Sequence, residues 1–427
     1  MKVLMFGWEF PPHITGGLGT ACYGMTKGLM KNQVKVLFVV PKAYGDEDQR
    51  AVRLINASDV AVTMDDQAFK TYWDNITYME IGSNLIPYLG PEEFEKTIRM
   101  NRARTTKHDL QQITDRRFSF SGAYGTNLLE EVSRYALIAS SVAAQYDHDI
   151  IHAHDWLTYS AGIAAKETSG KPLVVHMHAT EFDRSGENIN QLVYDIERRG
   201  MEAADRVIAV SNLTRAIVIE KYGIDPDKVV TVHNAVEPGS EGDFVNLKKN
   251  VNEKVITFLG RLTFQKGPEY FIEAAYQVLQ RSDKVRFVMA GSGDMMNKLI
   301  RRVAQLGISD RFHFTGFLKG ADVDKMFALS DVFVMPSVSE PFGIVPLEAM
   351  RSNVPVIISK QSGVSEILKH AIKVDFWDVD AMADAIYGLV HYHSLSHTFK
   401  KYGKSEVDAL KWDDAAYKIR NVYASLL

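Results

Sequence analysis

Short runs of β-branched and apolar residues alternate with helical patterns along most of the chain, and this alternation is the feature that most constrains the fold. Strand, helix and strand in succession are typical of a mainly parallel sheet covered by helices, so the sequence predicts an α/β protein. The expected strands are Lys2–Gly7, Val34–Val40, Asp149–Ala153, Pro172–His176, Arg206–Val210, Val229–Val232, Val255–Leu259, Arg286–Ala290, Arg311–Thr315, Val332–Met335 and Val354–Ile357.

The chain has 427 residues, which is too long for one ordinary core and indicates two or three domains. The alternation breaks at the turn-rich Pro238–Gly242 and the mostly polar Asn246–Asn252, so we expect two α/β domains joined by a linker near 238–250. Residues 43–145 fit the alternation poorly and are predicted to be an addition to the first domain. A basic run in this range fits a solvated helix face better than a site for an anionic ligand. Its members are Arg99, Arg102, Arg104, Lys107, Arg116 and Arg117.

Charge and cysteine content exclude several classes of protein. Lys and Arg total 49 against 53 Asp and Glu, a net charge of -4, so the chain lacks the broad basic surface that binds nucleic acid. The single cysteine, Cys22, forms no internal disulfide, which fits a reducing compartment. The apolar start Val3–Phe6 is interrupted too early for a signal peptide, and no apolar run is long enough to span a bilayer. We therefore expect a soluble, cytoplasmic protein.

A glycine-rich turn follows the first predicted strand. Gly16-Gly17-Leu18-Gly19 precedes a helix expected over Thr20–Met30. Glycines allow the backbone to approach a ligand closely, and a helix N-terminus offers free N–H groups and partial positive charge, which suits a diphosphate. The spacing differs from the dinucleotide fingerprint G-x-G-x-x-G, so the alternative is a turn with no ligand.

Two cations follow the strand Val255–Leu259. Arg261 stands in Gly260-Arg261-Leu262, and Lys266 comes five residues later. Ligands of open α/β sheets collect at the carboxyl ends of strands, which is where both cations are expected. Arginine can bind phosphate oxygens with two N–H groups and lysine supplies a compact positive charge, so this pair is a candidate phosphate site, with ordinary surface cations as the alternative.

Two glutamates flank the Pro-Phe-Gly turn after the strand Val332–Met335. Glu340 precedes the turn, and Glu348 falls near the start of a helix expected over Val345–Arg351. A carboxylate there can accept both hydroxyls of a ribose, while the free amides of Gly343–Val345 can meet sugar hydroxyls. Helix capping by one glutamate is the alternative.

Histidines close two neighbouring predicted strands. His152 and His154 end one strand, and His176 and His178 end the next. Residues two apart share a face of the sheet, so each pair could in principle hold a metal ion. No cysteine is close in the sequence and the strand ends suit sugar hydroxyls, so we predict a sugar pocket and no metal. Satisfied core histidines are the alternative for His152 and His176.

The motifs occur in one order: Gly-Gly-Leu-Gly, His-Ala-His-Asp-Trp, Gly-Arg-Leu with its lysine, and Glu-Pro-Phe-Gly with a second glutamate eight residues on. In this order they resemble the retaining GT-B glycosyltransferases, and within them the glycogen and starch synthase group and related α-glucan or sucrose-synthase-like enzymes. The resemblance covers nearly the whole chain except about 43–145. His178-Ala179-Thr180-Glu181 is as similar to sucrose-synthase-like and maltose-1-phosphate-synthase-like enzymes as to glycogen synthases, which leaves the acceptor open.

The resemblance implies two Rossmann-like domains facing each other across a cleft. The N-terminal acceptor-side domain covers residues 1–240, with an insertion at about 43–145, and the C-terminal nucleotide-sugar-binding domain covers 250–408. Trp412-Asp413 begins a segment similar to the helix that crosses back to the first domain in this fold, so residues 409–427 are expected to pack there.

The resemblance also implies a role for each motif. The cations bind the donor diphosphate, the second glutamate binds ribose, and the first glutamate contacts the transferred sugar. The implied catalytic residues are His178, Arg261, Lys266 and Glu340; the implied nucleotide-sugar ligands are Gly16, Gly17, Arg261, Lys266, Gly343, Ile344, Val345 and Glu348; the acceptor-side residues are His154 and Asp155.

The implied reaction is retaining transfer of a hexose, above all glucose, from ADP-glucose or UDP-glucose to an oligo- or polysaccharide acceptor such as an α-1,4-glucan, with no cofactor required. The alternatives are another GT-B glycosyltransferase, of maltose-1-phosphate, sucrose-type or cell-surface polysaccharide synthesis, a sugar-nucleotide epimerase, or a catalytically silent sugar-nucleotide sensor. A glycoside hydrolase is disfavoured because Glu340 and Glu348 are too close in sequence to flank a sugar, and such an enzyme would not need the cation pair. Nothing in the sequence predicts an oligomeric state.

Overall fold

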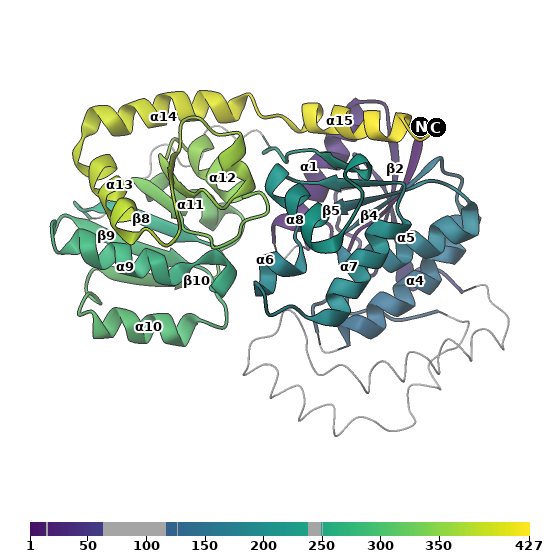
Figure 1. Ribbon diagram of the computed structural model, residues 1–427, viewed down its shortest axis with the longest axis horizontal. Helices are drawn as coiled ribbons and strands as arrows, with labels where there is room; N and C mark the ends of the chain where they lie inside the picture. Colours follow the sequence, from purple (N-terminus) through teal and green to yellow (C-terminus); the bar gives the residue numbers. More distant parts are fainter. Residues whose placement is uncertain (14–15, 63–116, 126, 238–248, 250) are drawn as a thin grey trace, which may run out of the picture.

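The computed structural model describes residues 1–427 apart from 14–15, 63–116, 126, 238–248 and 250. Two parallel sheets, each with helices on both faces, form two lobes side by side, and the last two helices run along one side of the molecule from the second lobe back to the first (Figure 1). Both chain ends lie on the first lobe (Figure 1). The predicted α/β class with two facing domains is confirmed.

The first lobe is built on a seven-stranded parallel sheet in the described part of the chain, in the order β3-β2-β1-β4-β5-β6-β7. Its strands are β1 (Lys2–Phe6), β2 (Lys35–Val40), β3 (Arg53–Asn56), β4 (Ile150–His154), β5 (Leu173–Met177), β6 (Arg206–Ala209) and β7 (Val229–Thr231). Its helices are α1 (Gly17–Lys31), η1 (Ala57–Asp59), α4 (Leu128–Gln145), α5 (Trp156–Ser169), α6 (Glu181–Ser185), α7 (Gln191–Ala203), α8 (Asn212–Tyr222) and η4 (Pro226–Lys228).

Side-chain alternation along β1 produces two cores, because successive residues of a strand point to opposite faces of the sheet. Leu4 and Phe6 pack in a core shared with α4, α5 and α7, while Val3 and Met5 pack on the other face under α1 and α15 (Trp412–Ala424). All residues of the central strands β4 and β5 are buried, as is typical of parallel strands covered on both sides.

The second lobe is built on a six-stranded parallel sheet, in the described part, with the order β10-β9-β8-β11-β12-β13. Its strands are β8 (Lys254–Leu259), β9 (Val285–Ala290), β10 (Phe312–Gly316), β11 (Val332–Met335), β12 (Val356–Ser359) and β13 (Ile372–Val374). Its helices are η5 (Phe264–Lys266), α9 (Pro268–Leu279), α10 (Met296–Gln305), α11 (Ala321–Leu329), α12 (Ile344–Arg351), η6 (Gly363–Glu366), α13 (Val379–His391) and α14 (His393–Asp408).

The range 43–145, expected to be an addition, contains two regular elements of the first lobe. Strand β3 pairs in parallel with β2, and α4 packs lengthwise against α5. The predicted addition therefore extends too far at both ends. The sequence did not indicate β3 because it is a short edge strand with a weak pattern, and it did not indicate α4 because a long stretch of sequence separates α4 from β3. The basic run, except the exposed Arg117, and the linker segment Pro238–Gly242 lie outside the described residues.

The C-terminal helix α15 packs against α1 of the first lobe, as the fold prediction required (Figure 1). Two glycines of α1 make this close approach possible: a Cβ at Gly24 would overlap the Trp412 ring, and one at Gly28 would lie 2.5 Å from the Trp412 carbonyl oxygen. At the far end of α15, the Tyr423 hydroxyl lies 2.5 Å from Nδ1 of His152 on β4. In the described part of the chain, no helix combines the length and apolar character needed to cross a membrane.

Candidate active site

The carboxyl ends of the two sheets meet along a seam between the lobes. Helix α6 of the first lobe contacts η5 of the second. The Ser339 hydroxyl of the second lobe donates to Oδ1 of Asp183 in α6 at 2.5 Å, and the Thr214 hydroxyl donates to the carbonyl oxygen of Pro341 at 3.3 Å. The segments that carry the predicted site residues of the two lobes are thus in contact.

Lys266 and Glu340 form an ion pair at this seam. Lys266 ends η5 and its Nζ lies 2.5 Å from Oε2 of Glu340, which also accepts a hydrogen bond from the Ser337 hydroxyl at 3.1 Å. Gly267 holds the turn that follows: its φ of 63° is left-handed, and a Cβ there would overlap the carbonyl oxygen of Pro336. The structure therefore brings together a predicted phosphate ligand and a predicted sugar ligand.

Arg261 is exposed at the end of β8, with its guanidinium 3.4 Å from Oε1 of Gln265. The backbone of its loop is held by a glycine pair after β9, which sequence analysis missed. A Cβ at Gly291 would overlap the Gly260 carbonyl oxygen, and one at Gly293 would overlap the Leu262 carbonyl oxygen. The signal was available in Gly291-Ser292-Gly293, because it repeats the strand-then-glycine pattern of the other ligand loops.

The Pro-Phe-Gly turn places the N-terminus of α12 next to Glu340. Gly343 caps this helix with a left-handed φ of 102°, and a Cβ there would lie 3.2 Å from Cγ of Glu340. The backbone N–H groups of Ile344 and Val345, which have no acceptor within the helix, therefore lie next to that carboxylate. Ile344 also packs against the apolar core under α1 in the first lobe, so the end of α12 reaches across the seam.

Glu348 lies one helical turn further along α12. Burial raises the pKa of Glu348 to about 7, against the opposing charge of Arg351 and with the added repulsion of Asp324. The charged neighbours of Glu348 are thus Asp324 on α11 and Arg351 on α12. Lys266 forms its ion pair with the other predicted glutamate, Glu340.

In the first lobe, Asp155 joins the ends of β4 and β5. Its Oδ1 accepts hydrogen bonds from the backbone N–H of His178 at 2.6 Å and of Ala179 at 3.4 Å, and its own φ of 57° is left-handed. Burial raises the pKa of Asp155 to about 7, although these N–H groups oppose the shift. Nδ1 of His154 lies 3.0 Å from Nε2 of His178, and burial lowers the pKa of His178 to about 3, so that histidine is neutral at pH 7.

The glycine turn near the N-terminus starts α1 earlier than expected, at Gly17 in place of Thr20. Gly16 has an extended φ of -169°, and a Cβ at Gly16 or Gly17 would meet no atom of the described residues within 4 Å. Contacts within the described part of the chain therefore do not require glycine at these two positions, which leaves ligand approach as a reason for their presence.

Glu366 is a second residue that sequence analysis missed. From η6 in the second lobe, its carboxylate accepts the N–H groups of Asn212 and Leu213 at the start of α8, at 2.9 and 2.7 Å, and lies 2.7 Å from Nε2 of His233. Burial opposes ionisation, yet these hydrogen bonds lower the pKa of Glu366. Only the tertiary structure reveals this contact, because its partners are more than 130 residues away in sequence.

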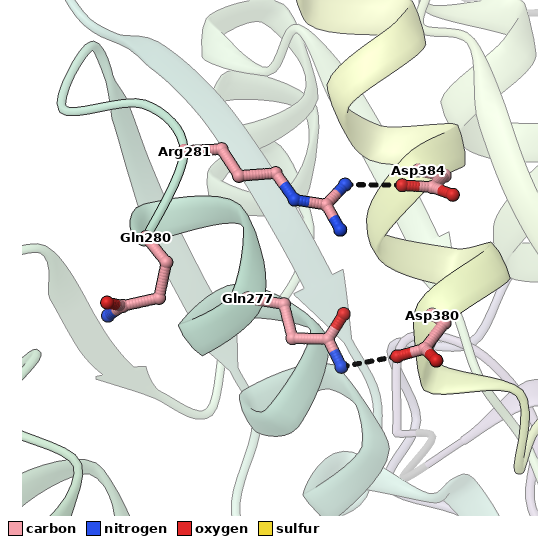
Figure 2. Close-up of a pocket in the computed structure, with 5 residues that line it drawn as sticks. All are labelled: Gln277, Gln280, Arg281, Asp380 and Asp384. Carbon is pink, nitrogen blue, oxygen red and sulfur yellow. Dashed lines mark hydrogen bonds and ion pairs between the residues drawn. The ribbon is translucent and has the colours of Figure 1, made fainter.

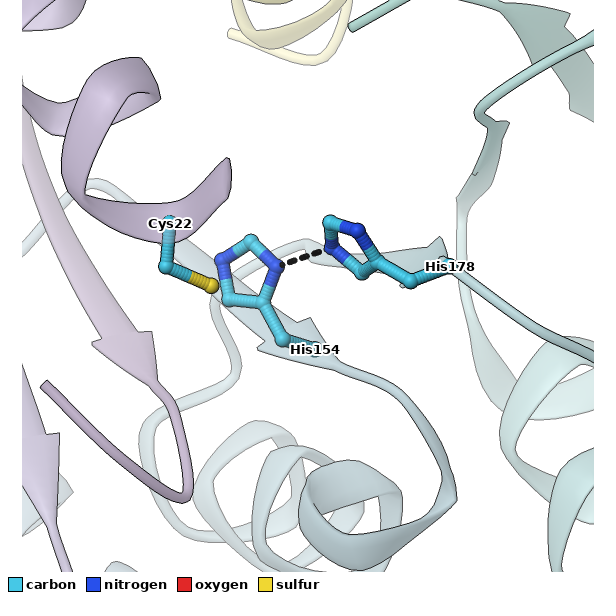
Figure 3. A group of neighbouring side chains, drawn as sticks. All are labelled: Cys22, His154 and His178. Carbon is cyan, nitrogen blue, oxygen red and sulfur yellow. Dashed lines mark hydrogen bonds between the residues drawn. The ribbon is translucent and has the colours of Figure 1, made fainter. Parts of the chain in front are cut away.

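One of the reasons for expecting no metal ion, the lack of a nearby cysteine, does not hold in three dimensions. Cys22 on α1 lies beside His154 and His178, and their ligating atoms are within 4.8 Å of one another (Figure 3). His152, His154 and His176 form a second such group. The fold therefore places a cysteine next to these histidines, although none is close to them in the sequence.

A pocket of about 480 Å³ lies away from the seam, between α9 and α13 (Figure 2). Its polar lining is largely paired: Gln277 donates to Asp380 at 2.6 Å, and Arg281 pairs with Asp384. It contains none of the predicted site residues, so the seam is the better candidate for chemistry.

Comparison with known proteins identifies the family. The family of glycosyl transferases group 1 matches residues 240–406, and Glycosyltransferase Family 4 matches residues 104–239. An uncharacterized glycosyltransferase of Methanocaldococcus jannaschii is 30% identical, covering 99% of this chain and 98% of that protein. The alpha-maltose-1-phosphate synthase of Mycolicibacterium smegmatis is 29% identical over 64% of this chain and 78% of its own.

Solved structures show the same fold. The sucrose-phosphate synthase of Thermosynechococcus elongatus has a TM-score of 0.71 at 17% identity, covering 100% of this chain and 98% of its own. Anabaena HepE in complex with UDP and glucose has a TM-score of 0.66 at 19% identity, with 100% of both chains covered. Two parallel α/β lobes with a returning C-terminal helix define the GT-B class of glycosyltransferase. The chain belongs to the glycosyltransferase family, in the branch related to glycogen synthase-like enzymes.

Proposed function

We propose that the protein transfers a hexose, with retention of anomeric configuration, from a nucleoside-diphosphate sugar to a carbohydrate acceptor. The observation that carries this proposal is the contact across the seam between α6, which directly follows the histidine-rich end of β5, and η5, which carries Lys266 paired to Glu340. A donor bound between these segments would have its diphosphate near the cations of one lobe and its sugar near His178 of the other.

The charge arrangement suits loss of a diphosphate leaving group. Negative charge grows on the leaving oxygens in the transition state, and preorganised cations in a dry site stabilise it. Glu340 holds Lys266 at the seam before any donor arrives. Arg261 lies at the end of β8, in the same loop and five residues before Lys266. Glu340 and the amides at the start of α12 then act as ligands for sugar hydroxyls.

His178 is placed to contact the sugar without adding charge. Its low pKa keeps the imidazole neutral, so it can exchange hydrogen bonds with hydroxyl groups. Asp155 positions this segment by binding its backbone N–H, and His154 lies behind the imidazole. In this proposal, the first lobe supplies the acceptor side and a neutral polar wall for the transferred sugar.

We further propose that the sugar is glucose, carried by UDP or ADP, and that the acceptor is an α-1,4-glucan or a short glucoside. Relatives named as glycogen synthase and alpha-maltose-1-phosphate synthase, and the HepE structure that holds UDP and glucose, support this choice. A relative from Escherichia coli is named as a galactosyltransferase that uses UDP-Gal, so galactose is the competing sugar in the test below.

The test is a panel of UDP-glucose, ADP-glucose and UDP-galactose, each with glycogen, maltose, glucose 1-phosphate or no acceptor. We expect nucleotide release that depends on a carbohydrate acceptor, and an α-linked product by NMR. A changed free sugar without acceptor would indicate an epimerase. If the folded protein neither binds nor consumes any sugar nucleotide of the panel, the proposal is wrong.

Replacing Lys266 by alanine tests the role of the cation. We expect Lys266→Ala and Arg261→Ala each to lower kcat by about a hundred- to a thousandfold, since each removes a positive charge that stabilises the leaving diphosphate. Lys298→Ala is the matched control, because Lys298 forms an ion pair of 2.6 Å with Glu269 on the outer surface of the same lobe. Near-native turnover in Lys266→Ala, with the fold intact, would contradict the assignment.

A further inference from the structure

Cys22, His154 and His178 come from three segments and converge at the edge of the first sheet. Cys22 lies on α1, His154 ends β4, and His178 follows β5. Figure 3 shows the sulfur of Cys22 lying against the His154 ring on the side away from His178. The ligating atoms of all three lie within 4.8 Å of one another.

Part of this cluster lacks the hydrogen bonds that buried polar groups normally make. His154 is completely buried and its Nε2 has no hydrogen-bond partner in the described part of the chain, while Cys22 is 1% exposed. Leaving a buried nitrogen without a hydrogen bond is energetically unfavourable, so a group of this kind calls for a ligand or a buried water. Cys22 also packs in the apolar core under α1, but this packing does not account for the unpaired nitrogen of His154.

We propose that Cys22, His154 and His178 bind a divalent transition-metal ion of the zinc class. Thiolate and imidazole are the donors that Zn²⁺ and Co²⁺ prefer. Neighbouring donors of a tetrahedral site are about 3.5 Å apart, so side-chain shifts of about an ångström close the set around an ion. Three protein ligands leave the fourth position open, and the partly exposed His178 provides a path for the ion from the seam.

The charges around the thiol favour this set over the neighbouring group of three histidines. Burial, together with the charges of the largely buried Asp155 and Glu9, raises the pKa of the Cys22 thiol, so the thiol keeps its proton until a cation arrives. On binding, the Cys22 thiol releases its proton to solvent, and the thiolate with these carboxylates compensates the charge of the ion. His152, His154 and His176 offer only neutral imidazoles to a dication.

A bound ion also changes the proposed reaction centre. The ion is coordinated by a ring nitrogen of His178, so metal binding and glycosyl transfer exclude each other. This consequence rests on the proposed function, whereas the metal site itself does not. We therefore expect Zn²⁺ to inhibit transfer. Cys22→Ser should weaken this inhibition by more than about tenfold and leave the uninhibited rate nearly unchanged, because Cys22 is not part of the proposed sugar site.

Cobalt titration of the chelator-treated full chain tests the site without any activity assay. Cys22 is the only cysteine in the sequence, so a thiolate-to-cobalt charge-transfer band can come from no other residue. We expect this band to saturate at about one Co²⁺ per chain, to disappear on adding Zn²⁺, and to be absent in Cys22→Ser and Cys22→Ala.

The exposed group of His13, Asp46 and Glu47 supplies the control, since it can hold cobalt only through nitrogen and oxygen. His13→Ala should leave the band unchanged. The proposal is wrong if cobalt binds the wild-type protein without a charge-transfer band. It is also wrong if cobalt does not bind at all. Because the band is read on resting protein, this result is independent of whether the panel of sugar nucleotides identifies a donor.

Discussion

Two carboxyl groups, the buried Asp155 in the first lobe and the partly exposed Glu348 in the second, have a pKa that loss of solvent raises to about 7. Asp155 accepts backbone N–H groups at the end of β5, so its task is to hold that segment in place. Glu348 lies near the start of α12, among Arg351 and Asp324. Each group changes charge near neutral pH, so each makes its own prediction.

Glu348 should make sugar-nucleotide affinity depend on pH. Ribose hydroxyls donate better to a carboxylate than to a carboxylic acid, so UDP-glucose should bind more tightly as the pH rises from 6 to 8. UDP-glucose suits this measurement because its diphosphate is a diester with no titration in this range. Calorimetry on Glu348→Gln should show weaker binding with the pH dependence largely removed; an unchanged pH profile in that variant would exclude Glu348 as the ribose ligand.

Asp155 should make stability fall as the pH rises. Its folded pKa lies above its ordinary value of 3.8, so between about pH 4 and 7 the folded protein holds a proton that the unfolded chain has released. The unfolding free energy therefore decreases through this window, and Asp155→Asn should reduce that decrease by roughly 1–3 kcal/mol. Urea unfolding at pH 5 and 7.5 measures it, with the exposed Asp310→Asn as the control; equal slopes in the Asp155 variant and wild type would contradict the assignment.

At the scale of elements, the contact between α1 and α15 joins the two ends of the chain. Gly24 and Gly28 form a smooth face on α1 where Trp412 packs, and α15 then covers the sheet as far as Tyr423. A different face of α1, turned toward the sheet, carries Cys22 toward the histidines of β4 and β5. This pair of helices therefore supports the strand ends that line the candidate site.

Gly28→Ala should destabilise the protein by about 1–3 kcal/mol, although alanine is the better helix former. The added methyl group would lie 2.5 Å from the Trp412 carbonyl oxygen and would push α15 away. Gly388→Ala in α13 is the matched control, since its nearest neighbour, Leu395, would be at an ordinary 3.5 Å. That control should gain up to about 1 kcal/mol. Thermal unfolding of both variants decides the matter; a stabilised Gly28→Ala would show that the helices are not in close contact.

At the scale of the whole molecule, the lobes meet at the seam through several polar contacts and through apolar packing, in which Ile344 contacts the core under α1 and Val210 joins the core of the second lobe. Glu366 binds the start of α8, and Ser339 binds Asp183 in α6. Interfaces between domains of one chain commonly allow the domains to move, and closure around a substrate can exclude water from a reaction. Glu366 is therefore placed to stabilise the arrangement in which the lobes are close.

Glu366→Ala should shift the molecule toward a more open arrangement, because it removes three acceptor contacts between the lobes at once. Small-angle scattering should show a larger radius of gyration for the variant without ligand, with a smaller difference when a sugar nucleotide is bound. Glu406→Ala is the matched control: Glu406 makes the same kind of contacts, to the N–H groups of Lys369 and His370 and to the His370 ring, within the second lobe. Identical profiles for Glu366→Ala and wild type would argue against this role.

From the sequence alone we predicted the α/β class, most strand positions to within two residues, and the order of the loops that carry the candidate site residues. These features depend on side-chain periodicity and on turn residues, which are local. Tertiary structure alone decided that Lys266 meets Glu340 across 74 residues of sequence, and that Glu366 reaches the start of α8 in the other lobe. It also decided that Cys22 lies beside the histidines and that burial shifts the pKa of Asp155 and Glu348. Burial and electrostatic coupling arise only when segments distant in sequence pack together, so no local pattern could have predicted them.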